Sequence, residues 1–153
     1  MNAKEQERAF AEKLRISPEF VNWFLSKTKF KDAVATPVLV RSDNPWYQSP
    51  TTGRQSETDI LAVFEYKDRL ERFAVHIENK TSKDSFRPQQ AELYHERAKD
   101  WLNIQKWGNY QDYEVILIAP QQFYERHKVI ASIFHRYVSH EELTRFLPEF
   151  GVV

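Results

Sequence analysis

The hydrophobic positions divide this chain into segments of helical and strand-like spacing. Between residues 3 and 28, large apolar side chains recur at the spacing of a helix. Ser17 is a residue type that caps helices, and Pro18 suits the first helical position. We therefore expect one helix that ends near Leu14 and a second that runs from Pro18 to Ser26.

The next three apolar segments have the character of β-strands. They cover residues 33–43, 58–66 and 72–80. The second and third are separated by a short polar turn, which predicts that they pair as a hairpin. Residues 44–56, with the sequence NPWYQSPTTGRQS, are rich in Pro, Ser, Thr and Gly, and this composition predicts a loop.

The second half of the chain alternates between helical and strand-like segments. Residues 88–107 have a helical composition, and residues 113–120 form a continuous apolar run that is typical of a strand inside a sheet. Residues 121–137 are spaced as an amphipathic helix, and residues 140–147 as a short final helix. The predicted order α-β-β-β-α-β-α favours an α/β fold with a mixed central sheet flanked by helices.

Composition narrows the class of protein. The 153 residues suit a single domain over residues 1–153, and the 41% apolar and 29% charged content is that of a folded chain. The chain has no cysteine, which excludes disulfides, zinc fingers, iron–sulfur clusters and thiol nucleophiles and fits a reducing cytoplasm. Its three glycines leave no room for a glycine-rich phosphate loop.

Charge and hydropathy bear on partners and location. No apolar run approaches the ~20 residues of a membrane span, and the opening MNAKEQERAF lacks the apolar region of a signal peptide. We therefore expect a cytoplasmic protein without a membrane partner. The formal net charge is zero, so any contact with nucleic acid should be confined to one cleft.

Candidate chemistry lies at the ends of the two strands predicted to pair. Side chains alternate along a strand, so Glu78 and Lys80 point to the same side, and Glu57 and Asp59 stand at the mouth of the neighbouring strand. Close carboxylates repel one another unless a cation bridges them, and hard oxygen ligands favour Mg²⁺ or Mn²⁺. An adjacent lysine can orient a water or offset charge on a phosphate. The pattern predicts metal-assisted hydrolysis of a phosphodiester.

The sequence ETD, followed after 18 residues by ENK, resembles the signature of the PD-(D/E)XK nuclease superfamily. This resemblance implies a restriction-endonuclease-like fold with an αβββαβ core. It also implies that Asp59, Glu78 and the main-chain carbonyl of Asn79 hold the metal, and that Lys80 acts on the water. Thr58 stands where the signature has proline.

Residues 90–94 read QxxxY, which resembles an additional motif of the RecB-type and phage-exonuclease branch of this superfamily. The resemblance implies that Gln90 and Tyr94 contact the substrate backbone or support the lysine. It further implies an acidic residue on the first helix that completes the metal shell. Glu12 is our first candidate, and Glu7 and Glu19 are the alternatives.

Several other residues allow two interpretations. Trp46 and Tyr47 either stack on a nucleotide base or cover the edge of the core. His76 shares a face with Glu78 but is more typical of a structural histidine, and Glu57 is assigned to substrate binding. A group of basic residues flanks the cleft in sequence and either holds phosphates or forms a solvated surface: Arg41, Arg54, Lys83, Arg87 and Arg97.

The function we predict is a Mg²⁺- or Mn²⁺-dependent nuclease that acts on DNA in phage defence, restriction or repair. The alternative is a catalytically silent nuclease-fold protein that binds nucleic acid or serves as an adaptor in a complex. Because a chain of 153 residues shows no separate target-recognition domain, we expect a homodimer or a partner subunit. The sequence does not decide whether the substrate is DNA or RNA, or whether the enzyme attacks ends or internal bonds.

Overall fold

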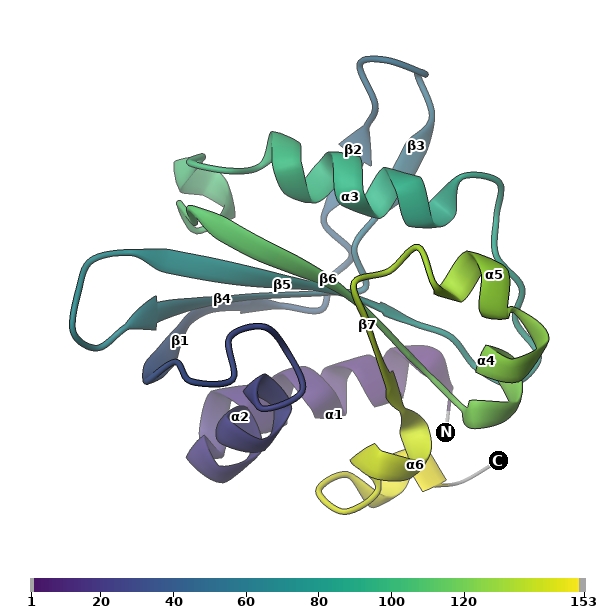
Figure 1. The fold of residues 1–153 in the computed structure, drawn as a ribbon, viewed down its shortest axis with the longest axis horizontal. Helices are drawn as coiled ribbons and strands as arrows, with labels where there is room; N and C mark the ends of the chain where they lie inside the picture. Colours follow the sequence, from purple (N-terminus) through teal and green to yellow (C-terminus); the bar gives the residue numbers. More distant parts are fainter. Residues whose placement is uncertain (1, 152–153) are drawn as a thin grey trace.

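The computed structural model describes residues 2–151, in which a five-stranded sheet lies between two layers of helices (Figure 1). The strand order is β1-β4-β5-β6-β7, with β1, β4 and β5 antiparallel and β5, β6 and β7 parallel. The prediction of an α/β fold with a mixed sheet flanked by helices is confirmed. The strands are β1 (Ala35–Arg41), β4 (Ile60–Tyr66), β5 (Arg72–Asn79), β6 (Asp112–Ala119) and β7 (Arg136–Ser139).

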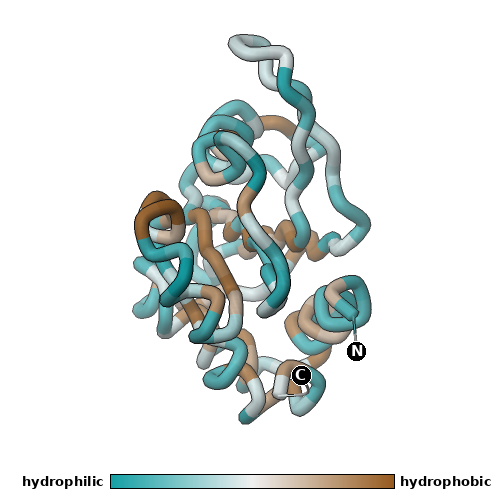
Figure 2. The backbone as a smooth tube through the Cα atoms, turned by 90° about the vertical axis from the view of Figure 1, so that its right-hand side faces the viewer, coloured by the Kyte–Doolittle hydropathy of each residue, from teal (hydrophilic) through white to brown (hydrophobic). Residues whose placement is uncertain are grey.

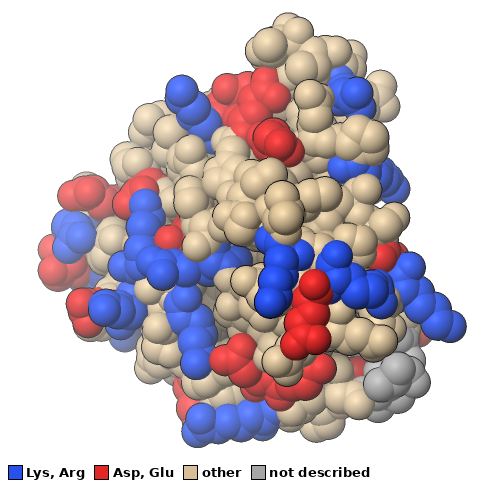
Figure 3. Space-filling view, turned by 45° about the vertical axis from the view of Figure 1, so that its right-hand side comes forward, with Lys and Arg blue, Asp and Glu red and all other residues tan. Residues whose placement is uncertain are grey.

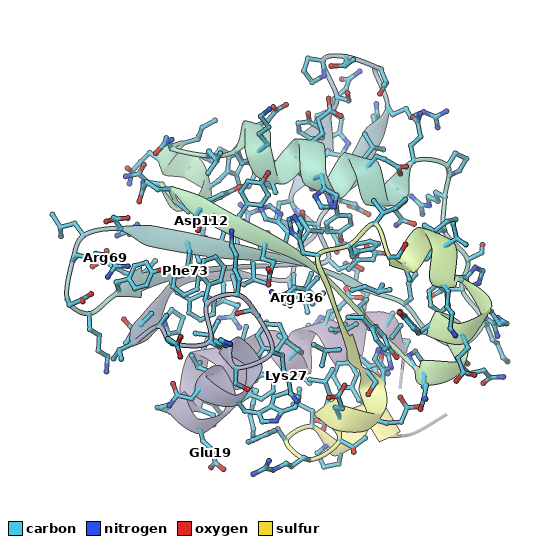
Figure 4. All side chains as sticks on the ribbon, viewed as in Figure 1. Glu19, Lys27, Arg69, Phe73, Asp112 and Arg136 are labelled. Atoms are coloured by element: carbon cyan, nitrogen blue, oxygen red, sulfur yellow. The ribbon has the colours of Figure 1, made fainter. Side chains whose placement is uncertain are left out.

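One face of the sheet is covered by α1 (Ala3–Ile16), α2 (Pro18–Leu25) and the short α6 (His140–Leu143) (Figure 1). The break between the first two helices lies where the sequence predicts it, since the Ser17 hydroxyl accepts a hydrogen bond from the Phe20 main-chain N–H. Lys27, just after α2, pairs with Glu142 of α6 at 3.4 Å and so links these two helices (Figure 4). A last 3₁₀ turn covers Pro148–Gly151.

The core on this face is rich in aromatic rings. Phe10 of α1 contacts Phe20 and Phe24 edge to face, each with ring centroids 5.1 Å apart. At one end of the sheet, Phe73 stacks on Phe30 with centroids 4.0 Å apart (Figure 4). Near this end Lys29 also pairs with Asp112, at 2.7 Å, so packing and charge together close the end of the sheet away from the candidate site.

The opposite face is covered by α3 (Gln90–Asp100), α4 (Gln121–Arg126) and α5 (Lys128–Ala131), with a 3₁₀ turn at Gln105–Trp107. Apolar side chains of α3 pack on β6, and the tube in Figure 2 shows hydrophobic residues concentrated in the central strands. The predicted helix over residues 88–107 is therefore too long. It ends at Asp100, and Asn103 and Gly108 then adopt positive φ and turn the chain back toward β6.

Two predicted elements are wrong. The predicted loop over residues 44–56 instead forms most of a β-hairpin of β2 (Trp46–Gln48) and β3 (Gln55–Glu57), which projects beyond the sheet (Figures 1 and 2). Residues 121–137 contain two short helices and then β7, because the helix breaks at His127 and the chain turns to pair with β6. The apolar spacing over residues 121–137 is typical of a helix, and a strand of four residues at its end is too short to change this pattern.

No helix among residues 2–151 is long and apolar enough to span a lipid bilayer.

A substitution at Gly108 tests the packing of the connection between α3 and β6. The φ of Gly108 is +90°, and an added Cβ would lie 2.9 Å from Cγ2 of the buried Val63 in β4. We expect Gly108→Ala to lower the free energy of unfolding by about 2–4 kcal/mol, from backbone strain plus overpacking. Gly53→Ala is the control, because φ is +73° there but nothing lies within 4 Å, so we expect only about 1–2 kcal/mol. Urea unfolding measures both, and equal losses would contradict the steric argument.

Candidate active site

The candidate site lies at the end of the sheet where β4 begins and where β5, β6 and β7 finish. Ile60 pairs with Ile77, so Asp59 stands beside the last residues of β5. The Asn79 main-chain N–H donates to Asp59 Oδ2 at 2.8 Å. The sheet register therefore brings together the two ends that the sequence predicts to meet.

Alternation along β5 sends successive side chains to different helical layers. Glu78 and Lys80 point toward α3 and the loop before it, whereas Asn79 points toward α1 and α6. The predicted common face of Glu78 and Lys80 is confirmed, with Nζ 3.3 Å from Oε2. The end of β5 is thus the place where all three layers of the fold meet.

Glu78 is buried, and both of its carboxylate oxygens have donors. The Tyr94 hydroxyl donates to Oε1 at 2.6 Å, and Gln90 Nε2 donates to Oε2 at 3.0 Å. Gln90 and Tyr94 lie one turn apart on α3, so the first turns of this helix hold the carboxylate from one side. Since an ionised carboxylate is costly to bury without donors, this arrangement accounts for Glu78 in the interior.

Tyr94 also contacts the other acidic residue. Its hydroxyl oxygen accepts a hydrogen bond from the Asp59 main-chain N–H at 3.0 Å. One hydroxyl group therefore links Asp59 to Glu78. Below the ring, the buried Arg97 guanidinium lies 4.1 Å from the ring centroid and donates to the Thr58 hydroxyl, which fixes α3 against the start of β4.

Lys80 is held in place although it follows the last residue of β5. Its main-chain N–H donates to the Ile118 carbonyl, which continues the pairing with β6. Its ammonium group donates to the Ser85 carbonyl at 2.9 Å and lies 5.3 Å from the Phe86 ring centroid. With only 6% of Lys80 exposed, the ammonium has a fixed position beside Glu78.

The structure does not bring Glu12 to this site. Its side chain is 61% exposed and pairs with Arg15 at 3.4 Å. Glu19 on α2 points away from the sheet (Figure 4). Glu7, named as an alternative, is buried and lines the cleft instead. Glu12 lies about 1.4 helical turns beyond Glu7, which puts it on a different side of α1.

The Asn79 side chain connects Glu7 to the C-terminal part of the fold. Its amide nitrogen lies 3.2 Å from both Glu7 Oε2 and Gln6 Oε1, and its oxygen lies 2.8 Å from Nε2 of His140. Burial lowers the pKa of His140 to about 4, so its ring is neutral at pH 7. Because the Asn79 amide nitrogen faces the oxygens of Glu7 and Gln6, the amide oxygen faces His140, and the tautomer that fits it carries its proton on Nε2.

Asp59, Glu78, Asn79 and Lys80 line a cleft of about 540 Å³. Lys4 and Glu7 come from α1, and Asn44 precedes the β2–β3 hairpin. The hairpin contributes residues 54–57, and the loop before α3 contributes Arg87 and Pro88. Glu57, assigned to substrate binding from the sequence, stands on the hairpin wall and is exposed to the cleft.

Burial and mutual repulsion raise the pKa values of two acidic groups in the cleft. Burial raises the pKa of Glu7 to about 7, and the charges of Glu78 and Glu57 add to this effect. Burial, followed by the charges of Glu78 and Glu7, raises the pKa of Asp59 well above its ordinary value. Ionisation of both carboxyl groups in the folded protein is therefore unfavourable unless a cation offsets their charge.

The donor set fits a hard divalent cation. The polar side chains that line the cleft carry only oxygen and nitrogen atoms. The buried Oδ1 of Asn44, whose amide nitrogen donates to Asp59 at 3.2 Å, has no hydrogen-bond partner within residues 2–151. Within the same residues, no three acidic or histidine side chains already converge as a ready metal cluster. Asp59, Glu78 and the Asn79 carbonyl, with Glu7 nearby, would hold Mg²⁺ only together with water, as this ion commonly requires.

The other residues singled out in the sequence divide between structure and surface. His76 is fully buried and bonded to Thr58 Oγ1 and the Tyr110 hydroxyl, so its interpretation as a structural histidine is confirmed. Tyr47 is buried, whereas Trp46 is 54% exposed. Of the flanking basic residues, Arg54 and Arg87 line the cleft. The remaining three do not: Arg41 pairs with Asp43, Arg97 is buried, and Lys83 lies outside the cleft.

Sequence reasoning missed Asn44, Lys4 and His140. His140 offered no signal, since it contacts the site only through the Asn79 side chain. Asn44 lies in an Asn-Pro pair and adopts a φ of 55°, a conformation that asparagine tolerates better than most residues. That dipeptide was a usable signal for a shaped turn, though not for its contact with Asp59.

No protein-family model, no curated protein and no solved structure matches this chain. The contacts of the residues around Asp59, Glu78 and Lys80 therefore carry the functional argument.

The raised pKa of Glu7 makes stability depend on pH. Folded Glu7 keeps its proton up to about pH 7, whereas the unfolded chain releases it near 4.5, so the stabilisation present below pH 4.5 is lost as pH rises to about 7. We expect Glu7→Gln to remove this loss, and to raise the free energy of unfolding at pH 8 by up to about 3 kcal/mol. Urea unfolding in chelator at pH 5 and pH 8 measures it. The exposed Glu12→Gln is the control, and equal behaviour of the two variants would contradict the assignment.

Proposed function

We propose that this chain is a metal-dependent nuclease of the PD-(D/E)XK superfamily, with a restriction-endonuclease-like core. The order α1, β1, β4, β5, α3, β6 supports this proposal, because it is compatible with an αβββαβ core into which α2 and the β2–β3 hairpin are inserted. The observation that carries it is the meeting of Asp59, Glu78 and Lys80 at one end of the sheet, with Gln90 and Tyr94 both bonded to Glu78.

In this proposal Asp59, Glu78 and the Asn79 carbonyl hold Mg²⁺ or Mn²⁺, and Glu7 takes the place expected for Glu12. A cation there supplies Lewis acidity toward a phosphate oxygen and the attacking water. Tyr94 and Gln90 set the direction of the Glu78 oxygens. The geometry supports a positioning role for both residues more directly than a contact with the substrate.

Lys80 orients the attacking water and offsets charge that develops on the phosphate. Its ammonium is suited to both tasks, because Ser85 and Glu78 fix its position at 2.9 Å and 3.3 Å. Arg54, Arg87 and Lys4 lie around the cleft, where they would contact flanking phosphates. We infer a cytoplasmic enzyme that acts on DNA in defence, restriction or repair, with a second copy or a partner subunit.

One observation favours the second candidate, a silent binding or adaptor protein of the same fold. Both Glu78 oxygens and Asp59 Oδ2 already accept hydrogen bonds from the protein itself. A carboxylate satisfied in this way has less need of a metal. Metal binding separates the two candidates, since the silent protein would show little.

Lys80→Ala tests the nuclease proposal. We expect metal-dependent cleavage of DNA by the parent chain and a loss of roughly 10²–10⁴-fold in the variant, because the group that acts on the water is gone. The assay uses linear and circular DNA, single- and double-stranded, with Mg²⁺ or Mn²⁺. Lys83→Ala is the matched control, since Lys83 is exposed and outside the cleft. Cleavage that survives in Lys80→Ala would refute the mechanism.

Tyr94→Phe tests the hydroxyl group that supports the Glu78 carboxylate and the Asp59 main chain. It keeps the buried ring but removes the hydroxyl that links Asp59 to Glu78, so we expect Mn²⁺ affinity to fall about 10–100-fold. Titration calorimetry measures the affinity. Tyr137→Phe is the control, because its hydroxyl donates to the Ala119 carbonyl and has no contact with either carboxylate. An unchanged affinity in Tyr94→Phe would exclude the hydroxyl from the metal site.

A further inference from the structure

The β2–β3 hairpin has two unlike faces. Trp46 pairs with Glu57 and Gln48 with Gln55, so these four side chains share one face of the antiparallel ribbon. Tyr47 pairs with Ser56 on the other face. The alternation separates the two adjacent aromatic residues, which the sequence alone could not assign to different roles.

The face that carries Tyr47 is anchored to α3. The Tyr47 hydroxyl donates to Asp100, and Arg97 donates to the Ser56 hydroxyl. The Ser49 hydroxyl donates to Glu96 at 2.7 Å. These contacts hold the projecting hairpin against the helix that also positions Glu78, so the hairpin has a fixed place relative to the site.

The other face is open and continuous with the cleft. Trp46 is 54% exposed, and its cross-strand neighbour Glu57 lines the cleft together with Gln55 and Arg54. A large exposed ring on a rigid support, with amides beside it, suits the face of a nucleotide base. The Glu57 carboxylate repels phosphate from this face, while the Arg54 guanidinium attracts phosphate at the rim.

We propose that Trp46 is a stacking platform for an unpaired base of single-stranded nucleic acid, with the neighbouring phosphate directed into the cleft. This inference rests on the proposed nuclease function and names its substrate class. An unpaired base has a face free to stack on a protein ring, whereas a base inside a duplex is already stacked on its neighbours on both sides. Gln48 and Gln55, on the same face, are placed to bond to the edge of that base.

Fluorescence anisotropy tests the platform. Both proteins carry Lys80→Ala, which prevents cleavage, and Mg²⁺ is present. The Lys80→Ala protein with and without Trp46→Ala is titrated into a labelled single strand of about 15 nucleotides and into the blunt duplex of the same length. We expect about tenfold weaker binding of the single strand and less than twofold change for the duplex. Trp46→Phe should restore most of the affinity, because it keeps an aromatic face.

Leu70→Ala is the matched control, since Leu70 is 89% exposed in the β4–β5 turn, at the other end of these strands. Equal weakening on single strand and duplex, or no weakening on either, would overturn the platform. So would a dimer, seen by sedimentation, that depends on Trp46 while DNA binding does not change.

The two proposals fail separately. Cleavage that depends on Lys80, together with unchanged binding by Trp46→Ala, removes the platform and keeps the nuclease. Selective loss of single-strand binding in Trp46→Ala, with no cleavage of any DNA by the parent chain, removes the nuclease and keeps the platform as a binding surface. Absence of binding to either DNA overturns the platform.

Discussion

Burial of the Glu78 carboxylate is the constraint on which this end of the structure depends. An ionised carboxylate without donors in the interior costs several kcal/mol, on the order of 3–5. The donors come from α3 through Gln90 and Tyr94 and from Lys80. The Tyr94 hydroxyl oxygen in turn accepts a hydrogen bond from the Asp59 main-chain N–H. The start of β4, the end of β5 and the first turns of α3 are therefore positioned by one set of hydrogen bonds, and the requirements of folding and of the candidate chemistry coincide there.

Three consecutive residues connect this constraint to the rest of the fold. Glu78 is bonded to α3, Asn79 to α1 and α6, and Lys80 to the loop that precedes α3. Strand alternation makes this possible, since it sends neighbours to opposite layers. Burial, and then the mutual repulsion of the carboxylates that this arrangement concentrates, raises the pKa of Asp59 and of Glu7. The site therefore lowers the stability of the fold at neutral pH, as strained functional sites often do.

The sequence predicted what local pattern controls and missed what long-range pairing controls. Residues 58–66 and 72–80 carried enough β-character to predict their hairpin and the face shared by Glu78 and Lys80. The four-residue β7 was hidden, because its pairing with β6 depends on the sheet and not on its own composition. The choice of Glu12 over Glu7 failed for a similar reason: both lie on α1, and only the packing of that helix against Asn79 decides which one faces the cleft.

Charge explains why a neutral chain is compatible with a nucleic-acid substrate. Lys and Arg side chains are interspersed with Asp and Glu over the face in Figure 3, and the formal net charge of the chain is zero, so this face offers phosphate little net attraction. The cleft is lined by five acidic and four basic residues, so without a metal it offers a phosphate little net attraction. One divalent cation would add two positive charges and make the net charge of the cleft positive. On the proposed function, the substrate backbone would be drawn to the cleft more strongly when the metal is present, and the hairpin would hold the strand chiefly by stacking on a base. Binding and metal loading would be coupled by this single balance of charge.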